Sequence, residues 1–82
     1  MDKKTKNIIV YSSPDCAYCY TLKSYLKTRG VLYEEIDIYE EETGIEKVKE
    51  ISGQSTLPVI LIDEEIIIGW DKQKLNNSLD LN

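Results

Sequence analysis

The sequence predicts an α/β domain built from a mixed β-sheet with helices packed on its faces. Short runs rich in Ile and Val alternate along the chain with segments whose apolar residues recur every three or four positions. The resulting order is strand, helix, strand, helix, strand, strand, helix, which is typical of a mixed sheet flanked by helices. With 82 residues and no internal repeat or low-complexity linker, the chain is expected to form a single domain over residues 1–82.

The first expected strand covers residues 7–12, where the β-branched run NIIVYS ends at Ser-Pro. A helix is expected over residues 16–29, because its apolar residues share one face: Cys19, Leu22, Tyr25 and Leu26. Asp15 or Ser13 is expected to cap the start of this helix. Gly30 can adopt the left-handed conformation that ends it.

A second strand is expected over residues 32–38, where Ile36 and Ile38 alternate with a polar residue. A second helix should follow and end at Gly53, with Gly44 weakening its first turn. The apolar residues of this helix are Ile45, Val48 and Ile51.

The last third of the chain predicts a hairpin and a final helix. The runs 58–62 and 65–69 are the two hairpin strands, although their turn lacks the Gly that tight hairpins favour. Asp71 is placed to cap the final helix. Across the whole chain, the expected core residues are Leu22, Leu26, Ile36, Ile38, Val48, Val59 and Leu61.

The composition argues against two classes of partner. Fifteen acidic and ten basic residues give a net charge of −5, which does not suit a phosphate backbone, so no nucleic-acid partner is expected. The dense basic group of Lys3, Lys4 and Lys6 is expected to be a solvated tail. No apolar run approaches the roughly 20 residues that span a bilayer, and the polar start resembles no signal peptide. A cytoplasmic protein without a membrane partner is therefore expected.

The only two cysteines, Cys16 and Cys19, stand three residues apart at the start of the expected helix. Residues i and i+3 share a helical face, so the two sulfur atoms can reach one another. Unpaired N–H groups at a helix start favour a thiolate, which makes Cys16 the nucleophile and leaves Cys19 to resolve the mixed disulfide. The carboxylate of Asp15 opposes this effect, and the sequence alone does not decide the balance.

Two other uses of the cysteines agree less well with the sequence. A structural zinc site needs four ligands, yet the chain has no His and no further Cys. A structural disulfide across three residues closes too small a loop to stabilise the fold much. A Cys-x-x-Cys pair that begins a helix after the first strand instead predicts redox chemistry that requires no metal.

Pro58 opens the first strand of the hairpin, in the run STLPVILI. It is either an ordinary proline at a strand start or a cis proline. A cis proline would expose the backbone of Leu57 to an incoming peptide.

Taken together, these motifs resemble those of the glutaredoxins, small members of the thioredoxin superfamily. The resemblance extends over essentially the whole chain and is carried by the segments IIVYSSPDCAYC, SGQSTLPVILID and IIIGWD. CAYC is similar to the family's Cys-Pro-Tyr-Cys site, and TLP is similar to its Thr-Val-Pro loop. The resemblance implies a thioredoxin-like fold with sheet order 2-1-3-4, in which the third and fourth strands form a hairpin.

The resemblance implies a dithiol oxidoreductase that reduces protein disulfides or glutathione mixed disulfides. Cys16 would attack, Cys19 would resolve, and Pro58 would be cis and lie against the pair. The backbone of Thr56 and Leu57 would bind the cysteinyl part of glutathione. Such a protein would use glutathione as co-substrate, hold no tightly bound cofactor and act as a monomer.

The resemblance implies a binding role for five further positions, three of which also have an ordinary structural alternative. Tyr18 would border the substrate cleft or be a simple exposed aromatic. Gln54 would meet the glycyl carboxylate or be a loop residue. Gly69 and Asp71 would hold the γ-glutamyl end at the start of the last helix. Trp70 would face a partner protein or pack that helix.

Departures from the family pattern leave two alternatives open. Ser13 stands where glutathione-using members carry Lys, while Ile68 and Lys72 replace a Gly and an Asp. These changes favour a redoxin reduced by thioredoxin reductase that donates electrons to an enzyme such as ribonucleotide reductase. Ala17, in place of the Pro of the family site, is instead consistent with a dimer that bridges a [2Fe–2S] cluster with glutathione.

Overall fold

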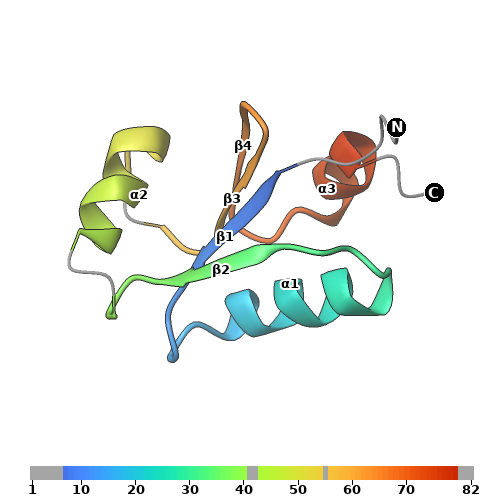
Figure 1. Cartoon of the computed structure of the whole chain (residues 1–82), viewed down its shortest axis with the longest axis horizontal. Coiled ribbons are helices and arrows are strands. Elements are labelled where there is room, and N and C mark those ends of the chain that lie inside the picture. Colours follow the sequence, from blue (N-terminus) through green and yellow to red (C-terminus); the bar gives the residue numbers. More distant parts are fainter. Residues whose placement is uncertain (1–6, 41–42, 55, 80–82) are drawn as a thin grey trace.

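A computed structural model describes residues 7–40, 43–54 and 56–79 of the chain (Figure 1). The basic tail expected at Lys3, Lys4 and Lys6 lies outside these residues. The predicted order of elements is confirmed. The elements are β1 (Ile8–Ser12), α1 (Ala17–Thr28), β2 (Glu34–Asp37), α2 (Gly44–Ser52), β3 (Val59–Ile62), β4 (Glu65–Ile68) and α3 (Lys72–Leu79).

The four strands form one mixed sheet in the order β2-β1-β3-β4, which confirms the predicted order. β1 pairs in parallel with β2 and antiparallel with β3, and β3 forms the expected hairpin with β4. Val10 on β1 thereby lies between Glu35 of β2 and Ile60 of β3. The C-terminal end of β1 leads directly into the cysteine loop, as Figure 1 shows.

The sheet separates two hydrophobic clusters because successive residues of a strand point to opposite faces. The larger cluster lies against α1 and α3, where Val10 and Ile60 pack with helical leucines. The smaller cluster lies against α2, where Val48 packs on Tyr11 and Val59. Full burial of one such aliphatic side chain stabilises the fold by about 1.5–3 kcal/mol.

Three of the expected core residues are only half-buried: Ile36, Ile38 and Leu61. Leu61 lies two residues beyond Val59 on the α2 face of the sheet. The nine residues of α2 cover the row that contains Tyr11 and Val59. The prediction that Leu61 belongs to the core was wrong because this helix does not extend over the next row of the sheet.

The structure corrects the predicted cap of α1. The N-cap residue is Cys16, whose Sγ accepts a hydrogen bond from the backbone N–H of Cys19 at 3.1 Å. Ser13 and Asp15, the expected caps, bond to one another instead, with Ser13 Oγ donating to the Asp15 carboxylate at 2.7 Å. Gly30 has a φ of 72°, so the left-handed residue predicted beyond the helix end is confirmed.

Two turns depend on particular residues. A Cβ atom on Gly44 would lie 2.7 Å from Cα of Ile38, so α2 can begin here only with a glycine. In the hairpin turn, Asp63 takes a φ of 52°, the left-handed conformation that Asp tolerates better than most residues. Its carboxylate accepts from the N–H of Asn7 at 3.0 Å, which ties the hairpin to the chain just before β1.

Candidate active site

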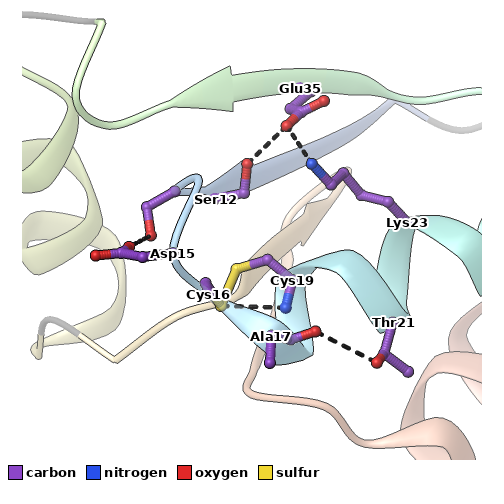
Figure 2. The surroundings of a disulfide bond; sticks show 9 residues. Ser12, Asp15, Cys16, Ala17, Cys19, Thr21, Lys23 and Glu35 are labelled. Carbon is purple, nitrogen blue, oxygen red and sulfur yellow. Dashed lines mark hydrogen bonds and ion pairs between the residues drawn. A yellow bond between two sulfur atoms is a disulfide. The ribbon is translucent and has the colours of Figure 1, made fainter.

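The two cysteines lie at the start of α1 and form a disulfide, with their Cα atoms 5.2 Å apart (Figure 2). Cys16 is half-buried, whereas Cys19 is completely buried on the face of α1 that packs against the sheet. A substrate can therefore approach the sulfur of Cys16 far more easily than that of Cys19. This asymmetry is consistent with the expected division of roles, in which Cys16 attacks and Cys19 resolves.

The start of α1 also directs a hydrogen-bond donor at the accessible sulfur. The N–H of Cys19 is one of the first-turn groups that have no partner within the helix, and it points at Cys16 Sγ (Figure 2). A donor at the positive end of a helix favours a thiolate over a thiol once the disulfide is reduced.

Asp15, the carboxylate expected to oppose this effect, points away from the two sulfur atoms (Figure 2). Its carboxylate accepts from the hydroxyl of Ser13, which is itself buried. Position 13, where the resemblance implied a lysine for glutathione use, therefore holds a hydroxyl that is already paired with a carboxylate.

The proline loop lies at the same end of the sheet as the cysteines. Tyr11 pairs with Val59, so Pro58 lies next to the end of β1 from which the cysteine loop begins. The Leu57–Pro58 peptide bond is cis and Pro58 is buried. The N–H of Gly69 donates to the carbonyl of Pro58 at 2.7 Å, which fastens the loop to the end of β4.

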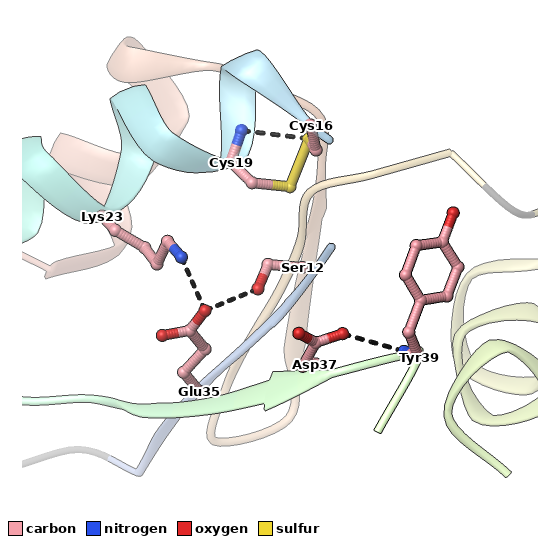
Figure 3. A network of polar contacts seen from close by, with 7 residues as sticks. All are labelled: Ser12, Cys16, Cys19, Lys23, Glu35, Asp37 and Tyr39. Atoms are coloured by element: carbon pink, nitrogen blue, oxygen red, sulfur yellow. Dashed lines mark hydrogen bonds and ion pairs between the residues drawn. A yellow bond between two sulfur atoms is a disulfide. The ribbon is translucent and has the colours of Figure 1, made fainter. Parts of the chain in front are cut away.

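An open pocket of about 410 Å³ adjoins this loop at Leu57. Tyr39, two-thirds exposed, stands at the end of β2 beside the loop (Figure 3). The pocket is mostly apolar and its single charged residue is Lys49 on α2. Its lining residues are Ile38, Tyr39, Ile45, Lys49 and Leu57.

The residues expected to bind glutathione are only partly brought together. Tyr18 is 63% exposed and follows Cys16 by two residues. Thr56 and Gln54 are exposed, and the hydroxyl of Thr56 donates to Oε1 of Gln54 at 3.0 Å. The amide oxygen of Gln54 is therefore occupied within its own loop.

The residues at the start of α3 have clear structural roles. Asp71 accepts from the N–H of Lys74 at 3.1 Å, so the predicted cap is confirmed. Trp70 is half-buried against the larger hydrophobic cluster and meets the ring of Tyr25 edge-on, with centroids 5.5 Å apart. Gly69 has a φ of 80°, a conformation that favours glycine.

A polar network close to the disulfide was not predicted from the sequence. Glu35 on β2 accepts on one carboxylate oxygen from the hydroxyl of Ser12 at 2.8 Å and from Nζ of Lys23 at 2.6 Å (Figure 3). The hydrogen bond from Lys23 is the largest of the effects that lower the pKa of Glu35; burial opposes it, and the bond from Ser12 adds to it. One local signal could have pointed to this network. Lys23 follows Cys19 by four residues, so the two side chains lie on the same face of α1.

The lowered pKa of Glu35 predicts a pH-dependent contribution to stability. A carboxyl group whose folded pKa lies below its unfolded value stabilises the fold above the unfolded pKa, and this stabilisation is lost as the pH falls through the folded value. We expect Glu35→Gln to be less stable than wild type by no more than about 1 kcal/mol at pH 7, because the carboxylate is partly exposed to solvent. In urea unfolding the difference should shrink as the pH falls below 4.5, the ordinary pKa, and vanish once the carboxyl group is protonated in the folded protein as well. A difference that stays constant over this range would contradict the assignment.

No helix among the described residues is long and apolar enough to cross a membrane. A four-stranded sheet with a Cys-x-x-Cys disulfide at the start of α1 and a cis proline beside it defines a redox protein of the thioredoxin fold. The chain belongs to the glutaredoxin family, because the family model described as Glutaredoxin matches residues 8–67.

Individual relatives agree with this assignment. The chain is 32% identical to an uncharacterized glutaredoxin-like 8.6 kDa protein of Clostridium pasteurianum, over 89% of this chain and 97% of that protein. It is 34% identical to glutaredoxin 3 of Escherichia coli, over 79% of this chain and 78% of the relative. The crystal structure of a glutaredoxin from Archaeoglobus fulgidus is 28% identical, covers 95% of this chain and 89% of its own, and has a TM-score of 0.82.

Proposed function

We propose that the protein reduces protein disulfides or glutathione mixed disulfides by dithiol exchange through Cys16 and Cys19. The single observation that carries this proposal is the asymmetry of the pair. Cys16 is accessible at a helix start, whereas Cys19 is fully buried behind it. This arrangement favours a mixed disulfide on Cys16 over one on Cys19.

The exchange needs no cofactor. The Cys16 thiolate attacks one sulfur of the substrate disulfide, whose other sulfur leaves as a thiolate and takes up a proton. Cys19 then loses its proton and attacks Cys16, which releases the second substrate thiol and forms the disulfide seen in the structure. Two electrons pass from the dithiol to the substrate, and a thiol donor or a reductase must return them.

Glutathione is the donor that the family membership favours, and we propose it as co-substrate of a monomer. The loop before β3 would present the backbone of Leu57, which is half-buried, to an extended cysteinyl peptide. Tyr18, Thr56, Asp71 and the mostly apolar pocket at Leu57 would border the bound molecule.

A thioredoxin reductase is the second candidate donor, and one observation favours it. The buried Ser13, paired with the carboxylate of Asp15, supplies no cation for anionic glutathione. With a net charge of −5, the protein would attract that tripeptide slowly. In this case the redoxin would pass electrons to an enzyme such as ribonucleotide reductase.

The rate at which glutathione reduces the Cys16–Cys19 disulfide separates the two donors. We expect reduction at least about tenfold faster than that of the linear peptide SSPDCAYCYT in its disulfide form. The first glutathione attacks the accessible Cys16 and releases Cys19, and the helix start then stabilises the Cys16 thiolate that departs when a second glutathione attacks the glutathione sulfur of the mixed disulfide. Quenched samples analysed by mass spectrometry would follow the reaction, with Trp70 fluorescence as a second signal.

A matched variant tests whether charge limits this step. Ser13→Lys restores the missing cation and should increase the glutathione rate several-fold, with the increase shrinking at high salt. If wild type is reduced no faster than the peptide, glutathione is not its donor. Rapid reduction by thioredoxin reductase and NADPH would then support the second candidate.

A further inference from the structure

The two helices that cover one face of the sheet, α1 and α3, carry only positive charge. Neither helix contains an Asp or a Glu, and their lysines are Lys23, Lys27, Lys72 and Lys74. The helix on the other face, α2, contains two Glu and two Lys residues. Because the whole chain has a net charge of −5, the positive charge of α1 and α3 is a local feature of an otherwise acidic protein.

The exposed flank of α1 begins at the reactive cysteine. Residues three, four or seven positions apart share a helical face, so Tyr20, Lys23 and Lys27 follow Cys16 along one stripe of α1. The N–H of Tyr20 donates to the carbonyl of Cys16 at 3.3 Å, which places Tyr20 one turn from the cysteine. Tyr20 is 71% exposed, and Lys27 is exposed as well. A substrate bonded to Cys16 can therefore extend along this stripe.

A hollow of about 150 Å³ lies on the stripe, between α1 and the edge strand β2. Lys23 and Glu35, which form an ion pair between α1 and β2, both line it (Figure 3). No ion pair among the described residues includes Lys27, so its ammonium group is available to a partner. The lining residues are Tyr20, Lys23, Ser24, Lys27, Tyr33 and Glu35.

The other polar groups of the hollow also suit an anion. Ser24 and the two tyrosines each have a hydroxyl proton to donate. Burial is the larger cause, and Glu35 the smaller, of a raised pKa of Tyr33, which Lys23 partly opposes, so this hydroxyl stays protonated at neutral pH. Glu35 is the one acid of the lining, and it already accepts from Lys23 and Ser12. An incoming carboxylate would thus meet the Lys27 cation and several hydroxyl donors.

The length of α1 sets the distance between the hollow and the reacting sulfur. Ser24 and Lys27 follow Cys16 by eight and eleven residues, which is about 12–17 Å along the helix axis. An extended chain covers this distance in about four or five residues. Glutathione extends by only one residue on either side of its cysteine, so it does not reach the hollow.

We propose that this hollow binds an acidic side chain of a protein substrate, about four or five residues from the cysteine that exchanges with Cys16. The inference rests on the proposed dithiol exchange and specifies its substrate class. It assigns Lys27 a role in choosing protein substrates, by attracting an acidic segment while the mixed disulfide forms. It assigns Lys27 no role in the reaction with glutathione.

Three synthetic peptides test the preference. Each has a central cysteine, held as its mixed disulfide with 2-thiopyridine, and a spacer of three Gly or Ser residues on both sides. The spacers lead to three glutamates in the first peptide, three lysines in the second and three glutamines in the third. The Cys16 thiolate bonds to the peptide sulfur, and the electron pair of the broken disulfide leaves with thiopyridone, whose absorbance gives the initial rate.

We expect reduced wild type to react at least about fivefold faster with the acidic peptide than with the basic one at low salt. This difference should disappear at about 0.5 M salt. The net charge of −5 taken alone predicts the opposite order. Lys27→Glu should reverse the preference, and Lys27→Gln should remove most of it.

Lys47→Glu is the matched control. Lys47 is an exposed lysine of α2, on the other face of the sheet, and its replacement changes the net charge by the same amount. This variant should keep the preference for the acidic peptide. The glutamine peptide should react at the same rate with every variant, and so should glutathione with the Cys16–Cys19 disulfide, because neither reaches Lys27 with a charge.

Three results would overturn the inference. A reaction of wild type with the basic peptide that is as fast or faster would show that overall charge prevails. Equal effects of Lys27→Glu and Lys47→Glu would exclude the hollow as the source of the preference. Loss of the preference in millimolar inorganic phosphate at constant ionic strength would make the hollow a site for free anions.

The glutamine peptide separates these failures from a failure of the proposed function. A normal rate with this peptide leaves the dithiol exchange intact whichever of the three results is found. If no peptide releases thiopyridone, the exchange itself fails and the inference fails with it.

Discussion

Cys16→Ser is expected to lower disulfide-reducing activity at least about a thousandfold, to the level of the uncatalysed exchange. A serine hydroxyl stays protonated near neutral pH and does not exchange with a disulfide, so the helix start has no thiolate to stabilise. Insulin reduction with dithiothreitol as electron donor measures this loss and does not depend on the natural donor. Turnover equal to wild type would refute the proposed mechanism.

Cys19→Ser is the matched control, because it removes the buried sulfur and keeps the accessible one. The variant should still form a mixed disulfide on Cys16, and this species should accumulate because nothing resolves it. Intact-mass measurement would detect the adduct, and digestion would place it on Cys16. Unlike Cys16→Ser, this variant retains the first step of the exchange.

The site could be predicted as far as it depends on neighbours in sequence. Cys16 and Cys19 are three residues apart, and the face shared by Cys19, Leu22 and Leu26 predicts which sulfur is buried. The cap of α1 was not predicted, because Ser13 and Asp15 are both good caps by type. Their mutual hydrogen bond, which leaves the role to Cys16, becomes visible only in three dimensions.

The network under the disulfide depends on strand register, which the sequence does not determine. Glu35 comes within reach of Ser12 because the parallel pairing sets Val10 opposite Glu35. A shift of one residue would turn Glu35 to the other face of the sheet. The half-burial of Leu61 likewise depends on how far α2 extends across the sheet. The spacing of the apolar residues in α2 does not predict this extent.

Gly44→Ala is expected to destabilise the fold by about 2 kcal/mol, and helix propensity alone predicts the opposite sign. Alanine favours a helix over glycine by about 0.5–1 kcal/mol. The added Cβ, however, would lie 2.7 Å from Cα of Ile38, a backbone atom that cannot rotate away. Overpacking of this kind costs about 1–3 kcal/mol, and the chain between β2 and α2 must move to relieve it.

The thermal midpoint should fall by about 10 °C, since 1 kcal/mol corresponds to about 4–8 °C in a domain of this size. Thr43→Ala is the control, because Thr43 is exposed and its side chain makes no capping hydrogen bond. The thermal midpoint of this variant should change little. A Gly44→Ala variant more stable than wild type would show that the contact with Ile38 relaxes without cost. The expected loss of stability would instead establish that the close approach of α2 to the end of β2 requires a glycine. From the sequence alone, Gly44 is identified only as a residue that weakens the helix.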